Sequence, residues 1–282
     1  MKKVLFIIML LLSLPGVSIA QDTTLKIMTS NIRMSTENDG INYWNYRRDW
    51  FNEMVNFEEI DIFGAQEVLY SQLEDIQQGL PGYDYIGVGR EGGHKGEFSP
   101  IFYLKEDFKV LDSGTTWLSE TPEVVGSRGW DAALPRIVSW AKFQRKSDGK
   151  QFYFFNTHFD HVGKQARRES ALLIKKLVES RAEGFAVFVT GDFNVPASSG
   201  AYRTMTSGEL SLSDTRLDAE KTYGPTYTFN GFQLEPNTER GPIDYIFYKG
   251  KVDILSYQVL DAQRGARFLS DHFPVIVKAK FM

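Results

Sequence analysis

Residues 152–161 read FYFFNTHFDH, and residues 187–194 read VFVTGDFN. Each stretch begins with aromatic or β-branched residues, which predict a buried strand, and each ends in amide, carboxylate or imidazole side chains. If several strands of this design end at one edge of a sheet, their polar groups are concentrated in a single crevice. These two stretches therefore predict both a strand-rich core and the place of a site.

Two further segments have the same design. Residues 25–28 lead to Asn31, and residues 62–65 lead to Gln66 and Glu67. Taken singly, an Asp or Asn after a strand usually bonds its own backbone in a turn. However, three of the four histidines in the chain lie in segments of this kind: His158, His161 and His272. A turn does not require imidazoles, so the combination favours a functional crevice.

The remaining pattern predicts a fold that mixes strands and helices without strict alternation. Helical spacing of apolar residues predicts helices over residues 46–59 and 163–183. We interpret residues 112–135, which carry Gly, Pro, Thr and Ser, as a long surface excursion. The glycines of residues 87–92 match a dinucleotide fingerprint, but the next residues, GHKG, cannot open a helix, so we expect a loop. Strands are predicted at residues 25–28, 60–65, 85–88, 101–104, 138–143, 152–155, 186–189, 243–248 and 275–277.

The composition of the 282 residues, 24% charged and 42% hydrophobic, excludes intrinsic disorder. Residues 1–20 combine two lysines, an apolar run and a small-residue exit, which predicts a signal peptide cleaved after Ala20 and an exported protein, periplasmic or secreted. The apolar run is shorter than the roughly 20 residues that cross a bilayer, so no transmembrane segment is expected after cleavage. Residues 21–282 are predicted to form one domain.

The chain contains no cysteine, so any metal must be bound by oxygen or imidazole ligands. Without Lys2 and Lys3 it carries 30 basic and 36 acidic residues, a net charge of −6. This surface does not indicate tight, sequence-independent binding of nucleic acid, although a crevice can be locally positive whatever the total charge. No stable protein partner can be inferred.

Six short motifs, taken together, resemble the endonuclease/exonuclease/phosphatase superfamily of DNase I-like, metal-dependent phosphodiesterases. They occur in that superfamily's order over nearly the whole of residues 21–282: Ser30-Asn31, Gln66-Glu67, Asn156-Thr157-His158, Gly191-Asp192-Phe193-Asn194, Ile243-Asp244-Tyr245-Ile246 and Ser270-Asp271-His272-Phe273-Pro274-Val275. The resemblance implies an α/β (α+β) fold: a four-layer DNase I-like sandwich of two mixed, mostly antiparallel β-sheets packed face to face, with helices on the outside.

The resemblance also implies roles for individual residues. Glu67, Asn31 and Asp271 would hold Mg²⁺ or Mn²⁺. Asp192 and Asn194 would position the attacking water and the phosphate. His272, oriented by Asp244, would act with His158 in proton transfer and in neutralising charge in the transition state. Glu97 stands where the superfamily keeps the acid that orients the first histidine, and Arg136 resembles its phosphate-contacting arginine. His161, Trp117 and Trp130 remain open between functional and purely structural roles.

The implied function is an exported, divalent-metal-dependent hydrolase of phosphoester bonds, nuclease-like in type. Nucleic acid is the leading substrate and a phospholipid headgroup the runner-up, because residues 112–135 carry no apolar or basic stripe for a membrane surface. A sugar or inositol phosphate phosphatase on the same fold is the alternative. A non-enzymatic binding domain is a further alternative, disfavoured because binding alone requires neither a metal carboxylate nor two histidines.

Overall fold

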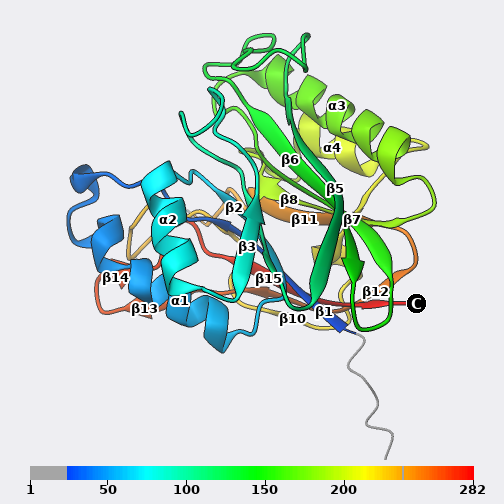
Figure 1. Cartoon of the computed structure of the whole chain (residues 1–282). Helices are drawn as coiled ribbons and strands as arrows, with labels where there is room; N and C mark the ends of the chain where they lie inside the picture. Colours follow the sequence, from blue (N-terminus) through cyan, green and yellow to red (C-terminus); the bar gives the residue numbers. More distant parts are fainter. Residues whose placement is uncertain (1–23, 237) are drawn as a thin grey trace, which may run out of the picture.

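A computed structural model describes residues 24–236 and 238–282, and the predicted signal peptide lies outside these residues. The chain folds into two β-sheets that lie face to face between two pairs of helices (Figure 1). Helices α1 (Arg48–Phe57) and α2 (Tyr70–Gly79) cover one sheet, and α3 (Lys164–Ala182) and α4 (Gly200–Thr206) cover the other. The predicted four-layer α/β sandwich is confirmed.

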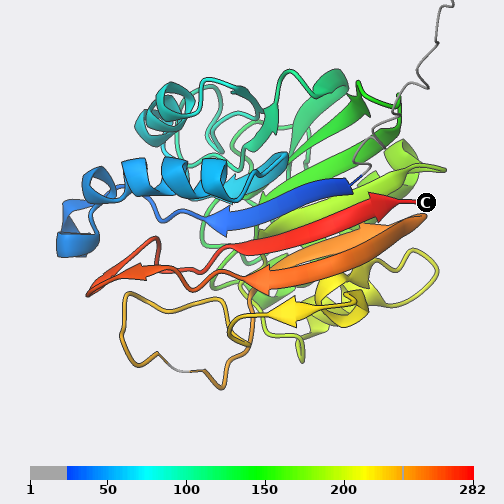
Figure 2. The ribbon, with the colours of Figure 1, turned by 90° about the horizontal axis from the view of Figure 1, so that it is seen from below.

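The first sheet has seven strands, and its two central strands, β1 and β2, run parallel. Strand β15 runs antiparallel to β1 and to β12, and these three strands lie side by side in Figure 2. In order across the sheet the strands are β10 (Thr222–Tyr223), β12 (Val252–Val259), β15 (Val275–Phe281), β1 (Thr24–Asn31), β2 (Ile62–Gln66), β4 (Ile101–Leu104) and β3 (Tyr83–Ile86).

The second sheet has six strands, and all neighbours except the parallel pair β7 and β8 run antiparallel. In order the strands are β5 (Phe108–Trp117), β6 (Ile137–Arg145), β7 (Gln151–His158), β8 (Ala186–Asp192), β11 (Asp244–Lys249) and β9 (Ser213–Asp214). The smaller elements are the ribbon of β13 (Gln263–Arg264) and β14 (Arg267–Phe268), helix α5 (Thr215–Asp218), and the 3-10 helices η1 (Glu37–Asn42) and η2 (Trp44–Tyr46).

Three apolar layers hold the sandwich together. The layer between the sheets contains residues such as Leu25, Ile27, Phe152 and Phe154. The outer faces of the two sheets pack against α1 and α2 in one case and against α3 and α4 in the other. Since alternate residues of a strand point to opposite faces, both faces of the central strands are buried, which explains their nearly continuous apolar runs.

The structure confirms both predicted helices, as α1 and α3, and places a strand at each predicted strand segment. The interpretation of residues 112–135 as a surface excursion is wrong for its first part, because β5 runs to Trp117. Strand β5 lies at the edge of its sheet, where exposed positions tolerate polar residues, and this hides the strand pattern. The glycine-rich loop after β3 contains no helix, as expected. No helix of the described residues is long and apolar enough to span a bilayer.

Candidate functional site

Strand register places three of the predicted site residues in one row across the second sheet. His158, the last residue of β7, lies beside Asp192 at the end of the parallel strand β8. Asp192 in turn lies beside Asp244, the first residue of the antiparallel strand β11. Backbone pairing alone thus makes neighbours of His158 and Asp192, which are 34 positions apart in sequence, and of Asp192 and Asp244, which are 52 positions apart.

The first sheet supplies the facing group of residues. Asn31 ends β1 and lies beside Gln66 at the end of the parallel strand β2, and Glu67 follows directly. The amide nitrogen Nδ2 of Asn31 donates to Glu67 Oε1 at 3.0 Å and to Asp192 Oδ2 at 3.1 Å. Asn31 therefore connects the two sheets at the ends of strands β1 and β8.

A polar network fills the layer between the sheets next to this point. Asn156 Oδ1 accepts hydrogen bonds from Gln66 Nε2 at 2.7 Å and from Thr190 Oγ1 at 3.0 Å, and Asn156 Nδ2 donates to the carbonyls of Ala65 and Pro100. All of these side chains are buried, so their mutual hydrogen bonds offset the cost of removing them from water. The network supports the site residues from behind.

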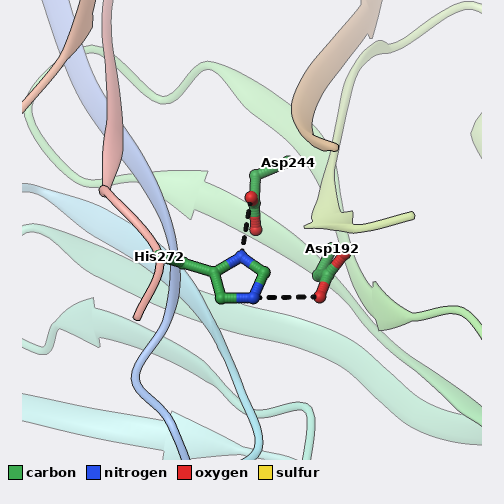
Figure 3. A group of neighbouring side chains, drawn as sticks. All are labelled: Asp192, Asp244 and His272. Atoms are coloured by element: carbon green, nitrogen blue, oxygen red, sulfur yellow. Dashed lines mark hydrogen bonds and ion pairs between the residues drawn. The ribbon is translucent and has the colours of Figure 1, made fainter. Parts of the chain in front are cut away.

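His272 lies between two carboxylates (Figure 3). Its Nδ1 is 2.9 Å from Asp244 Oδ2, and its Nε2 is 3.8 Å from Asp192 Oδ2. Burial alone favours the neutral ring, but Asp244 and Asp192 outweigh it and raise the pKa of His272 to about 10. Burial and the neighbouring Asp244 raise the pKa of Asp192 to about 7.

His158 has the opposite electrostatic environment. Burial and the guanidinium of Arg136 hold the pKa of His158 well below its usual value. Its Nε2 is 3.1 Å from Asn194 Nδ2 and 3.5 Å from Asp192 Oδ2. Asn194 has a left-handed backbone, φ 53°, and its backbone N–H donates to Asp192 Oδ1 at 2.8 Å. Its side-chain Nδ2 also donates to the carbonyl of Phe159 at 3.0 Å, which holds the amide beside His158.

Glu97, predicted to orient His158, lies near it without a hydrogen bond. Its Oε2 is 3.9 Å from His158 Nδ1, and it forms a closer ion pair with Arg90 at 2.8 Å. Among the described residues, Nδ1 of His158 has no hydrogen-bond partner. The orienting role of Glu97 stays a prediction.

Arg136, predicted to contact the phosphate, is buried beside His158. Its Nε pairs with Asp160 Oδ2 at 3.4 Å, and its NH2 lies 3.1 Å from His161 Nδ1. Asp160 also accepts the backbone N–H groups of Val162 and Gly163. His161 is therefore in contact with Arg136, the residue that is predicted to bind the phosphate.

Two groups of side chains suit a divalent cation. Asp192, Asp244 and His272 are buried and offer ligand atoms within 4.8 Å of one another, which makes them a candidate metal site. Glu67 and Asp271 form the predicted ligand set together with Asn31. The guanidinium of Arg33 lies near both carboxylates, 3.7 Å from Glu67 Oε2 and 3.9 Å from Asp271 Oδ2. The oxygen-rich donor set of Glu67, Asp271 and Asn31 fits a hard cation such as Mg²⁺ or Mn²⁺.

A pocket of about 340 Å³ brings these groups together. Apart from Asn31 and Asp244, which lie behind its wall, every predicted site residue lines it. Sequence reasoning missed five other lining residues: Arg33, Met34, Leu134, Phe229 and Arg240. Arg33 lies two positions after Asn31, and this proximity to a motif could have identified it. A larger cavity of about 720 Å³, beside Phe185 and Phe281, is lined by no histidine and by none of the site residues.

Comparison with known proteins identifies relatives over most of the chain. A sequence model described as the Endonuclease/Exonuclease/phosphatase family matches residues 28–272. A protein of this family from Bacteroides vulgatus has a solved structure that is 43% identical, covers 92% of this chain and 100% of its own, and superposes with a TM-score of 0.89. A mannosyl-6-phosphatase from Bacteroides thetaiotaomicron is 41% identical, covers 91% of this chain and 100% of its own, and has a TM-score of 0.85. A protein of Acanthamoeba polyphaga mimivirus is 29% identical over 276 residues, 90% of this chain and 99% of its own.

Proposed function

Because the chain belongs to the Endonuclease/Exonuclease/phosphatase family, we propose that it hydrolyses a soluble phosphate monoester of a sugar with a divalent cation as cofactor. The observation that carries this proposal is the convergence of carboxylates, three histidines and arginines on one small pocket. Hydrolysis of a phosphate ester requires charge neutralisation on the phosphate, a positioned water and proton transfer to the leaving oxygen. The pocket contains side chains for each of these tasks.

The predicted ligands Glu67, Asn31 and Asp271 would hold Mg²⁺ or Mn²⁺. A bound divalent cation supplies positive charge to the non-bridging oxygens of the phosphate. Arg33 balances the two carboxylates when no cation neutralises them, since it lies within 4 Å of both. Glu67 and Asp271 thus give this wall of the pocket the carboxylate oxygens that a hard divalent cation prefers.

On the opposite wall, Asp192 and Asn194 would position the attacking water and the phosphate. Asp244 binds Nδ1 of His272, so the Nε2 edge of the ring faces Asp192 and the reacting groups. His272 and His158 would transfer protons and neutralise the negative charge that develops on the phosphate. The position of Asp192 within 4 Å of both rings supports this assignment.

Three observations favour a small sugar phosphate over a polymer. A pocket of about 340 Å³ is near the lower end of small-molecule sites, which span about 300 to 1,000 Å³. The relative that is 41% identical and matches along its whole length is a mannosyl-6-phosphatase. The net charge of −4 over the full chain also offers no broad basic surface for a nucleic acid backbone. The nuclease-like and phospholipid alternatives become arms of the test.

The proposal is tested by measuring phosphate release from mannose 6-phosphate, glucose 6-phosphate, inositol phosphates, plasmid DNA, RNA and sphingomyelin vesicles, each with Mg²⁺, Mn²⁺ or Ca²⁺. We expect turnover of sugar phosphates, loss of it with EDTA and recovery with Mg²⁺ or Mn²⁺. Glu67→Gln should require a higher metal concentration, whereas the exposed Glu179→Gln, on α3, should not. Full activity after exhaustive chelation contradicts metal dependence, and turnover of only nucleic acid or only vesicles contradicts the sugar phosphate substrate.

We further propose that the protein is exported, to the periplasm or the medium. The lysine-flanked apolar run of residues 1–20 supports this proposal. Fractionation of cells that express the full chain should recover a shortened protein, beginning at Gln21, outside the cytoplasm. Recovery of the uncleaved chain in the cytoplasm contradicts export.

A further inference from the structure

Arg33 has a strained backbone that several hydrogen bonds hold in place. Its φ is +59°, in the left-handed region that a long side chain rarely adopts. Its N–H donates to Asn31 Oδ1 at 3.0 Å, and its carbonyl accepts from Gln72 Nε2 at 2.9 Å and from the buried guanidinium of Arg47 at 3.2 Å. Strain that is maintained by surrounding contacts is common at functional positions.

The same network fixes the direction of the Arg33 side chain. Asp39 accepts two hydrogen bonds from its guanidinium, from Nε at 3.1 Å and from NH2 at 3.2 Å. The side chain keeps 31% of its surface exposed and lines the pocket beside Glu67 and Asp271. The Arg33 guanidinium is therefore held in one position and remains accessible to a ligand, whereas the side chain of a solvated surface arginine is free to move.

Arg33 and Arg136 line the same pocket from different sheets. Arg33 follows β1 of the first sheet, whereas Arg136 precedes β6 of the second and is held by Asp160. Each arginine is thus paired with an acid, Asp39 or Asp160, that does not belong to the predicted metal ligands. A phosphate group in the pocket would meet one fixed guanidinium on each side.

The number of fixed cations matters because phosphate esters differ in charge. A phosphate monoester carries about −1.5 to −2 at neutral pH, since its second pKa is about 6, whereas a diester carries one negative charge. A guanidinium that donates to two terminal phosphate oxygens gains most from the more highly charged ester. A second arginine thus discriminates between the two ester classes.

We propose that Arg33 is a substrate-binding residue that makes this site select phosphate monoesters over phosphate diesters. The inference rests on the proposed function, and it deepens that proposal by naming the residue that sets the substrate class. Asp39 is the positioning residue that holds the Arg33 guanidinium in the pocket wall.

The test uses Arg33→Asn, because asparagine tolerates the left-handed backbone while the variant loses the guanidinium and its hydrogen bonds to Asp39. Initial rates on 4-nitrophenyl phosphate and bis(4-nitrophenyl) phosphate give kcat/KM for a monoester and a diester. We expect the monoester kcat/KM to fall about 10- to 100-fold, as for loss of a charged hydrogen-bonding pair, and the diester value to fall less than about threefold. Arg33→Lys should give an intermediate monoester value, and the control Arg168→Gln, at an exposed position of α3, should match the wild type.

Two binding measurements separate this role from charge balance at the metal ligands. The affinity for inorganic phosphate, from calorimetry of the Mn²⁺-loaded protein, should fall with the monoester rate, while the affinity for Mn²⁺ itself should not fall, because the variant removes a cation that lies within 4 Å of Glu67 and Asp271. Equal losses on both esters, or tighter Mn²⁺ binding with an unchanged ester ratio, overturn the inference. If the wild type hydrolyses neither ester, the proposed function fails, and phosphate binding still decides about Arg33: weaker binding in Arg33→Asn supports its role, and equal binding overturns it.

Discussion

Strand β7 connects two contrasting regions of the layer between the sheets. At its start, Phe152 lies in a cluster of phenylalanine rings, with Phe143 and Phe281 at centroid distances of 5.6 and 5.5 Å. Six residues later, about 20 Å along the strand, His158 lines the pocket. On this one face of the strand, aromatic residues give way to an amide, Asn156, and then to an imidazole.

Neighbouring strands repeat the same change toward the site. On β8 the corresponding face passes from Phe188 to Thr190 and Asp192, and on β1 it passes from Ile27 to Thr29 and Asn31. Apolar burial contributes stability without direction, whereas buried polar groups require fixed partners. Residues that stabilise the fold and residues of the site therefore lie at opposite ends of the same strands. Substitutions at the apolar end should mainly change the free energy of unfolding, and substitutions at the polar end should mainly change kcat.

The largest effect on stability is expected at the aromatic end. Phe152→Ala leaves a cavity among Phe108, Phe143, Phe188 and Phe281, and should lower the free energy of unfolding by about 3 to 5 kcal/mol. Denaturant unfolding measures this loss, and kcat of the protein that remains folded should be near the wild-type value. A large fall in kcat without a loss of stability contradicts the separation of the two ends.

His158→Ala should produce the reverse result. Loss of an acid–base group is expected to lower kcat at least about 100-fold, whereas the free energy of unfolding should change by less than about 2 kcal/mol. The stability effect should be small because the ring has one contact at hydrogen-bond distance, with Asn194, and longer contacts with Asp192 and Glu97. The matched control is Tyr153→Phe, which should leave kcat unchanged. Tyr153 lies on the same strand, β7, but its side chain belongs to the outward face that packs against the helices. Near-normal kcat in His158→Ala would refute its assigned role.

His272→Ala should also lower kcat at least about 100-fold, but with a measurable loss of stability. It removes the ring that lies between two buried carboxylates, Asp192 and Asp244, and so removes the cation that compensates their negative charge. Asp244→Asn should reduce kcat less than His272→Ala does, because the amide keeps a hydrogen bond to Nδ1. Equal effects of the two variants would contradict an orienting role for Asp244.

Asn156→Ala tests the boundary between the two regions. It removes the acceptor of Gln66 and Thr190 and the donor to two carbonyls, so the free energy of unfolding should fall by about 1 to 3 kcal/mol. Thr190→Val removes a single member of the network and should cost less. Both unfolding and kcat should change, because the network lies directly behind Asn31 and Asp192. An unchanged kcat would show that the polar network does not position the site residues.

The sequence predicted the fold where strands are buried on both faces. Apolar runs such as residues 152–155 and 186–189 are visible without any structure, because neither face of these strands meets water. Strand β5 was missed because it is an edge strand, and α2 was missed because only three of its ten residues are buried. Elements that are partly exposed lose the pattern that single-sequence reasoning requires.

The site residues were predictable as motifs, but their partners were not. Asp271 and His272 are adjacent in sequence, whereas the contact of His272 with Asp192 depends on how the two sheets pack. Arg33 was missed for the same reason: its role in the pocket depends on Asp39 and on contacts with Glu67 and Asp271 that are remote in sequence. Long-range convergence is the part of a site that spacing along the chain cannot encode.

The smallest effect is expected from Asp61, which precedes β2 at the end remote from the pocket. Burial and the negative charge of Asp107 raise its pKa to about 6, although it accepts the backbone N–H of Lys26 at 2.6 Å and lies near Arg145. An acid whose pKa is raised in the folded state, from about 3.9 when unfolded, stabilises the fold at low pH and loses that contribution as the pH rises through 6. Relative to the wild type, Asp61→Asn should therefore gain about 1 kcal/mol in the free energy of unfolding between pH 5 and pH 8. The difference between the two proteins isolates Asp61 from the titrating groups of the site, and Asp253→Asn, at an exposed position of β12, should show no such gain. A constant difference across this pH range would contradict the raised pKa of Asp61.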